Sequence, residues 1–223
     1  MNYEQEYEFT ELELERLRRA SDVTEIQNLM AKYIELMSKM EASKCFELFA
    51  DQDDISIELA EAGGYDGKDH VKLFLDTYDE YLRNPSDKRG YMDVQLICNP
   101  TVLTSKDHKR AEGYWTIIAP GSKWGMEYPN DIEKLVPHWQ CGKYYVKFVY
   151  ENEEWKIKDL KMVLFLRSPF TEGWMKQADC VHMPTFQNIK PDREPDYFTV
   201  YNADYGCAYG GIEWGPYLPD SIE

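Results

Sequence analysis

The chain has 223 residues, and 25 basic against 41 acidic side chains give it a formal net charge of −16. This length suits one domain with an appendage, or two small domains. The acidic balance argues against a nucleic-acid partner, because phosphate binding requires clustered Lys and Arg, and it argues equally against an anionic membrane surface. The longest wholly apolar run, residues 162–166, is far shorter than the ~20 residues of a membrane-spanning helix. We therefore expect neither nucleic acid nor a membrane as partner.

The cysteines and the first residues indicate the compartment. The five cysteines are odd in number and widely spaced, and no CxxC occurs, so neither a zinc site nor a disulfide framework is predicted. The acidic, polar start does not resemble a signal peptide. Motifs of dinucleotide binding, of P-loops and of nucleophilic serine elbows are absent from the sequence. A protein of the reducing cytoplasm is expected.

The first quarter of the chain has helical periodicity. Residues 1–20 form a charged helical lead-in, and Ser21 or Asp22 is expected to cap a new helix, with Glu25 near capping-box spacing. A second short helix is expected at 42–50. The apolar face of the first core helix recurs at intervals of three and four, through Ile26, Leu29, Met30, Tyr33, Ile34 and Met37.

The spacing of the apolar residues changes after the second helix. Alternation of apolar and polar residues predicts a strand at 54–60, ended by two glycines, and a helix follows at 67–82. Glu58 and Glu61 are expected at the surface. Period-two alternation then predicts four more strands, at 92–105, 110–119, 139–150 and 155–167.

Two segments lack periodicity. Residues 120–137 are rich in Pro and Gly and are expected to form a loop of the kind that often covers a site, packed through Trp124, Met126 and Tyr128. Residues 168–223 hold six of the eleven prolines and ten of the 32 aromatic residues. Exposing so many aromatic rings is costly, so this segment is expected to wrap the domain or a neighbouring subunit. The chain thus divides into 1–20, 21–167 and 168–223.

The order of helix, helix, strand, helix and four strands is an α+β arrangement. Short stretches with residue patterns found in one protein superfamily lie at 26–33, 46–51, 65–67, 99–100, 112–115, 142–144 and 155–157. In combination they resemble the SnoaL-like branch of the NTF2-like superfamily over residues 22–167. Residues 168–174 resemble the exit sequence of a longer-tailed subgroup of that family.

The resemblance implies a cone, in which a curved mixed β-sheet wraps around three N-terminal helices, here with an irregular aromatic-rich C-terminal extension. Members include scytalone dehydratase, ketosteroid isomerase, polyketide cyclases, bile-acid dehydratases and γ-formaldehyde lyases. These enzymes use acid/base chemistry on hydrophobic ring compounds, without metals or organic cofactors. The resemblance therefore implies a cofactor-independent lyase or isomerase that acts on a hydrophobic, aromatic or polycyclic small molecule.

Other outcomes stay open, because many members of the superfamily only bind ligands or proteins. The alternative is a non-catalytic module that binds a hydrophobic ligand or another protein. The resemblance also implies a homo-oligomer, either a trimer or a dimer.

The family's usual catalytic positions are mostly not retained. The first-helix tyrosine is present as Tyr33, but the positions of the usual Asp, His and second Asp fall at Ser38, Gln95 and Ala119. Three of the four expected groups are therefore absent. Either the groups have moved, or the reaction differs, or the protein is not an enzyme.

Tyr33 and His138 are the candidate catalytic residues. The Tyr33 hydroxyl could donate to developing oxygen charge, or it could be a core tyrosine bonded to the backbone. His138 shares strand parity with Tyr144, so it could project into the cone as a general base. The alternative for His138 is an edge position after Pro137.

The remaining candidates concern binding. Polar and apolar side chains expected to line the cone are Asp93, Gln95, Trp115, Ile117, Tyr144 and Leu164, and an ordinary filled core is the alternative. Asp93 could also act as a base if it is buried, and His182 could cap the pocket from the tail. His70 and His108 are expected in solvent, and no histidine pair has metal-ligand spacing, so no metal site is predicted.

Overall fold

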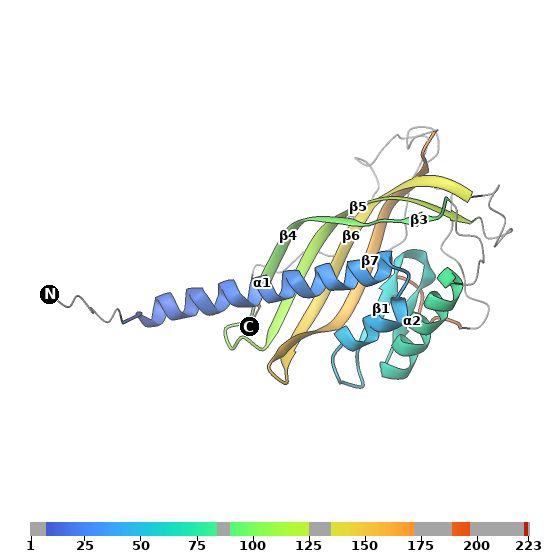
Figure 1. Ribbon diagram of the computed structural model, residues 1–223. Helices are drawn as coiled ribbons and strands as arrows, with labels where there is room; N and C mark the ends of the chain where they lie inside the picture. The colour runs from blue at the N-terminus through green and yellow to red at the C-terminus, as the bar shows by residue number, and fades with distance from the viewer. Residues whose placement is uncertain (1–7, 84–89, 125–134, 172–188, 197–220, 223) are drawn as a thin grey trace.

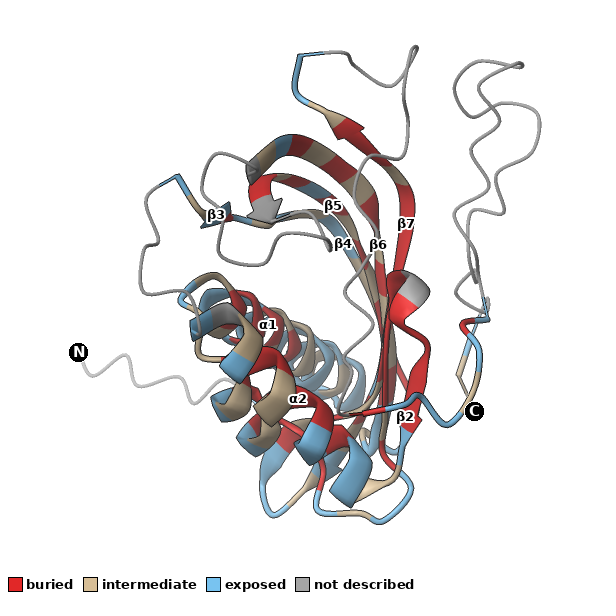
Figure 2. Ribbon diagram, turned by 90° about the vertical axis from the view of Figure 1, so that its right-hand side faces the viewer, coloured by how far each residue is buried: buried red, intermediate tan, exposed pale blue. Residues whose placement is uncertain are grey.

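The protein is a half-open cone of one curved sheet with helices on its concave side (Figures 1 and 2). The computed structural model describes residues 8–83, 90–124, 135–171, 189–196 and 221–222. The concave face holds the long helix α1 (Glu11–Ser38), the 3₁₀ helix η1 (Ala42–Leu48) and helix α2 (Lys68–Arg83). The expected α+β cone is therefore confirmed. Within the described part of the chain, none of the helices is long and apolar enough to cross a bilayer.

Helix α1 is continuous, so the predicted new start at Ser21 or Asp22 is wrong. Its N-cap is Thr10, which forms a capping box with Glu13. Asp22 lies inside the helix, where its carboxylate accepts a hydrogen bond from Trp155 Nε1 at 3.1 Å. The predicted apolar face is confirmed, because the buried residues of the helix are Ile26, Met30, Tyr33, Ile34 and Met37.

Seven strands form the sheet, in the order β2-β1-β7-β6-β5-β3, and β4 also pairs with β5. Strands β1 and β7 are parallel and the other pairs are antiparallel. The strand bounds are β1 Ser56–Leu59, β2 Gly64–Asp66, β3 Met92–Asp93, β4 Leu96–Thr104, β5 Arg110–Trp124, β6 Leu135–Glu151 and β7 Glu154–Pro169. A short 3₁₀ turn, Ala60–Ala62, returns the chain from β1 to β2.

The hairpin of β5 and β6 is longer than predicted, and the expected loop at 120–137 is wrong at both ends. Strand β5 continues through Pro120 to Trp124, and β6 begins at Leu135. Pro120 is tolerated because its carbonyl accepts from Val94 N at 3.4 Å, on the side where β3 and β4 are interrupted. The N–H that proline lacks would point to the same side, so the regular ladder loses no bond. Residues 125–134, with Met126 and Tyr128, lie outside the described residues.

A bulge in β7 changes which side chains enter the cone. Gly142 pairs with Leu164, whereas Cys141 pairs with Leu166, so one extra residue stands in β7. Simple alternation would place Leu166 on the same face as Leu164, but the bulge turns Leu166 outward, where it is only half-buried, and turns Arg167 inward, where it is buried.

The C-terminal segment 189–196 lies against the sheet edge at β2, where Gly64 forms an isolated bridge with Arg193. Arg193 also forms an ion pair with Glu58. Glu58 is 1% exposed, so its predicted surface position is wrong, because a basic side chain from the tail covers it. The side chain of Glu61 lies outside the described residues, as do tail residues 172–188, which include His182, and 197–220.

Candidate functional site

Four polar side chains are buried together at one end of the cone. They project from the inner face of β3, β6 and β7, and they are Asp93, His138, Gln140 and Arg167, with 4%, 1%, 2% and 2% exposure. Buried charged and polar groups are costly unless they are paired, so such a layer is more typical of a site than of an ordinary core. We call these four residues the polar layer.

The strand register brings Asp93 and His138 together across a glycine. Asp93 pairs with Gly121 on β5, and Gly121 pairs with His138 on β6. Paired residues of neighbouring strands point to the same face, so both side chains lie on the inner face with no side chain between them. A Cβ atom at Gly121 would lie 3.3 Å from His138 Nε2, which shows that the imidazole ring leans over the glycine.

The backbone fixes the tautomer of His138. Its Nδ1 lies 2.8 Å from the carbonyl oxygen of Val136. A carbonyl oxygen only accepts hydrogen bonds, so Nδ1 carries the hydrogen and a neutral ring presents Nε2 as the proton acceptor. Nε2 is buried. The expected inward projection of His138 is confirmed in geometry, and its role in catalysis stays a prediction.

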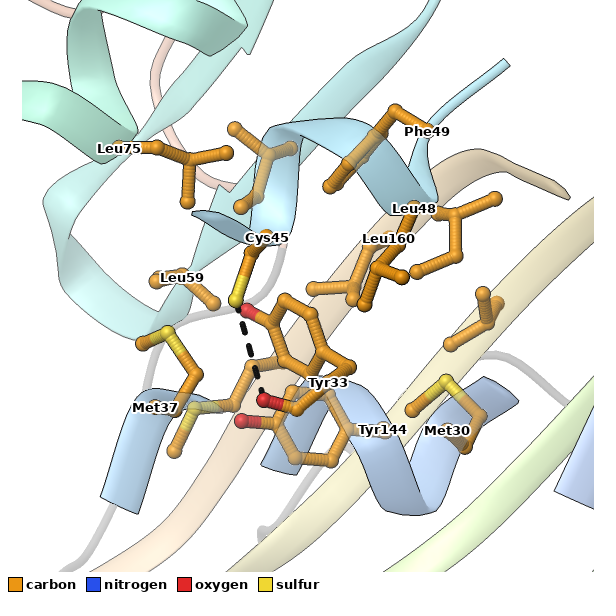
Figure 3. Close-up of a cluster of buried hydrophobic side chains, with 14 of the residues drawn as sticks. Met30, Tyr33, Met37, Cys45, Leu48, Phe49, Leu59, Leu75, Tyr144 and Leu160 are labelled. Carbon is orange, nitrogen blue, oxygen red and sulfur yellow. Dashed lines mark hydrogen bonds between the residues drawn. The ribbon is translucent and has the colours of Figure 1, made fainter. Parts of the chain in front are cut away.

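Three buried tyrosines, Tyr33, Tyr78 and Tyr144, lie within electrostatic reach of Asp93 in the polar layer. The rings of Tyr33 and Tyr144 meet edge to face, with centroids 6.0 Å apart (Figure 3). Burial raises the pKa of Tyr33, of Tyr78 and of Tyr144 well above its ordinary value, and the negative charge of Asp93 raises each of them further. These hydroxyls therefore stay protonated and can act as hydrogen-bond donors.

The tyrosine hydroxyls differ in their partners. Tyr144 donates to Gln95 Oε1 at 2.7 Å. The Tyr33 hydroxyl is buried and has no hydrogen-bond partner among the residues that the structure describes. A buried hydroxyl without a partner loses its hydration and gains nothing in return. Tyr33 therefore has the features of a group kept for a ligand.

The apolar candidates continue the inner face away from the polar layer. Trp115, Ile117 and Leu164 are at most 2% exposed. Trp115 packs edge to face against Phe148, with ring centroids 6.1 Å apart.

A hollow of about 760 Å³ lies on the outer side of the sheet. Its wall includes Glu112, Tyr145, Lys147, Asp159 and Arg193. The polar layer contributes none of the side chains that line it. We place the candidate site at the polar layer, because buried titratable groups converge there, whereas the outer hollow is lined by groups that pair with one another at the surface.

Two other histidines, His70 and His108, lie away from the site. His70 is exposed and pairs with Asp192 at 2.7 Å. His108 was expected in solvent, but its side chain is 17% exposed, and its two ring nitrogens contact Asp22 at 2.5 Å and Glu15 at 2.9 Å. The tight turn before β5 holds His108 against α1, which is why that expectation fails.

Three site residues escaped prediction. Gln140 shares strand parity with His138, a signal that could have found it. Tyr78 stands at helical spacing with Phe74 and Leu75, which indicates only an apolar position of the helix. Arg167 could not be found by alternation, because the bulge in β7 reverses the parity. The Arg167 Nε donates to Gln140 Oε1 at 3.2 Å, and its positive charge lowers the pKa of Tyr78 against the larger effect of burial.

Comparisons with known proteins agree with the fold. No curated protein matches the sequence. A candidate scytalone dehydratase from Novosphingobium aromaticivorans has a similar structure, with a TM-score of 0.53 and 14% identity over 75% of this chain and 97% of that one. The dehydrochlorinase LinA-type3 from Novosphingobium barchaimii gives 0.52 and 14%, over 76% and 99%. A type 2 hexachlorocyclohexane dehydrochlorinase gives 0.54 and 16%, over 76% and 97%.

These identities establish a shared fold and nothing finer. A model of the SnoaL-like domain matches residues 18–161, which is more than half of the chain. The matched region contains α1 from residue 18 onward, both helices that follow it, and every strand up to the middle of β7. The chain therefore belongs to the SnoaL-like domain family.

Proposed function

We propose that the protein is a cofactor-independent lyase, which removes a proton and a leaving group from neighbouring carbons of a hydrophobic ring compound. The observation that carries this proposal is the alignment of Asp93, Gly121 and His138 in the sheet register. The acid and the histidine that the family usually places elsewhere are here supplied by β3 and β6. An isomerase would begin with the same proton transfer.

Each group has a role in the elimination. His138 Nε2 takes a proton from carbon, the electron pair of that C–H bond forms the double bond, and the leaving group departs with its own pair. The carboxylate of Asp93 stabilises the imidazolium that forms. Tyr33 donates a hydrogen bond to oxygen on which negative charge develops, which its raised pKa permits.

The structural relatives support the reaction class. Their names describe a dehydratase and dehydrochlorinases, that is, loss of water and loss of hydrogen chloride. Both reactions remove a proton from carbon and expel a leaving group. The buried histidine with a defined tautomer provides the base that such a step requires.

Deuterium exchange tests the proton transfer without knowledge of the leaving group. The protein is incubated in D₂O with hydrophobic ring ketones, cyclic β-hydroxy ketones and hexachlorocyclohexane, and mass spectrometry follows deuterium uptake and loss of water or HCl. We expect turnover of at least one probe, about 100-fold slower in His138→Gln and in Asp93→Asn. His70→Gln is the matched control and should keep the wild-type rate. Equal rates in all four proteins would refute the assignment.

One observation favours the alternative of a non-catalytic binding module. Gln95 stands where the family usually has a histidine. Its amide oxygen accepts a hydrogen bond from the Tyr144 hydroxyl, and an amide cannot serve as a general base. A probe that binds, and is recovered without deuterium and without elimination, would support this alternative over the lyase.

A further inference from the structure

The first turns of α1 form an arm that projects beyond the sheet (Figure 1). We define the arm as residues 9–20. Its large apolar side chains are exposed, with 53% for Phe9, 60% for Leu12, 43% for Leu14 and 53% for Leu17. These are unusually many exposed apolar side chains for so short a segment, and large exposed apolar side chains gathered on one element commonly mark an interaction site.

The arm is a defined structural element rather than a frayed end. The capping box of Thr10 and Glu13 closes its first turn. At the other end, His108 holds Glu15 and Asp22 against the turn that precedes β5. A surface that is fixed in this way loses little conformational entropy on binding.

The charges of the arm are divided between its two halves. The first half carries the acids Glu11, Glu13 and Glu15, and the second half carries Arg16, Arg18 and Arg19. This order suits the helix dipole, but the dipole does not account for the exposed leucines. A partner with the same two halves in reverse order would place its bases along the acidic half of the arm, and the arm of a second copy is such a partner.

We propose that the arms of two copies pair as antiparallel helices around a two-fold axis near the midpoint between Leu14 and Glu15. Two pairs that share one face of the helix then stand at the same level along the two arms. Leu12 is level with Leu17 of the second copy, and Glu13 is level with Arg16. A parallel pairing would instead set acid against acid and base against base, so the charge order selects the antiparallel arrangement.

Sedimentation velocity across a dilution series of the full chain tests the pairing. The wild type should self-associate, and Leu12→Glu/Leu17→Glu should weaken that association at least tenfold. Thermal unfolding verifies that the body of each variant remains folded. Wild-type protein that stays monomeric throughout the series, or an association that the double variant does not weaken, would overturn the proposal.

Two charge-reversed chains give a sharper test, because only the antiparallel register predicts that each reversal weakens self-association. Arg16→Glu/Arg18→Glu replaces two of the three bases of the arm, and Glu11→Arg/Glu13→Arg replaces two of its three acids. Each variant alone should associate at least tenfold more weakly than the wild type, whereas a one-to-one mixture should recover a heterodimer. The second variant loses the capping box, so circular dichroism should establish that its helix persists. Folded variants that fail to associate when mixed would overturn the antiparallel pairing.

Discussion

Removal of the Tyr33 hydroxyl should stabilise the protein. The hydroxyl is buried and has no hydrogen-bond partner among the described residues, so its desolvation costs about 1–3 kcal/mol without compensation. Tyr33→Phe removes that cost and leaves a void of about one methyl group, which costs about 1 kcal/mol. We expect a net gain of about 1 kcal/mol in the free energy of unfolding, or a Tm higher by about 2–4 °C in a chain of this length.

Tyr144→Phe is the matched control, because Tyr144 is equally buried and its ring contacts the ring of Tyr33. Its hydroxyl has a partner, Gln95, at 2.7 Å. Loss of this bond also leaves the Gln95 amide oxygen without its donor, so we expect a loss of about 1–2 kcal/mol. Urea denaturation of the two variants and the wild type, followed by fluorescence, measures both changes.

The two substitutions should therefore move stability in opposite directions although they remove the same atom. A Tyr33→Phe protein that is less stable than the wild type by 1 kcal/mol or more would refute the reasoning, because the hydroxyl would then have a structural partner. If the proposed lyase role holds, the stabilised Tyr33→Phe variant should also turn over the probe at least about tenfold more slowly.

Three further predictions concern stability. Gly142→Ala should cost more than about 3 kcal/mol, because its Cβ would lie 2.1 Å from the Val163 carbonyl oxygen at the bulge, and calorimetry that shows a near-native Tm would contradict this. His108→Gln should lower the free energy of unfolding by about 1–2 kcal/mol at low pH. The carboxylates of Asp22 and Glu15 raise the pKa of His108. The loss of stability should therefore be complete below the ordinary pKa of 6.5, and it should disappear as the pH rises through the raised pKa. A pH-independent cost in urea titrations would exclude that mechanism. Arg193→Gln leaves the buried Glu58 carboxylate with a weaker partner and should cost about 2–3 kcal/mol, and limited proteolysis should then cut the C-terminal segment faster.

The sequence by itself determined the elements whose pattern is local. Apolar residues at intervals of three and four placed Tyr33 on the buried face of α1, and strand alternation placed His138 and Tyr144 on one face of β6. The family's stretches, added to the order of the elements, predicted the cone. These features depend on neighbours within one or two turns of a helix or along one strand, which the sequence displays directly.

The tertiary structure alone decided which side chains meet. Asp93 and His138 are 45 positions apart in the sequence, and only the register of two strand pairs sets them across Gly121. The bulge that turns Arg167 inward cannot be read from alternation, because one extra residue reverses the parity of everything after it. Glu58 is buried because Arg193, 135 residues later, covers it. Such contacts depend on register and on chain closure over long separations, and the local pattern of residues does not specify either.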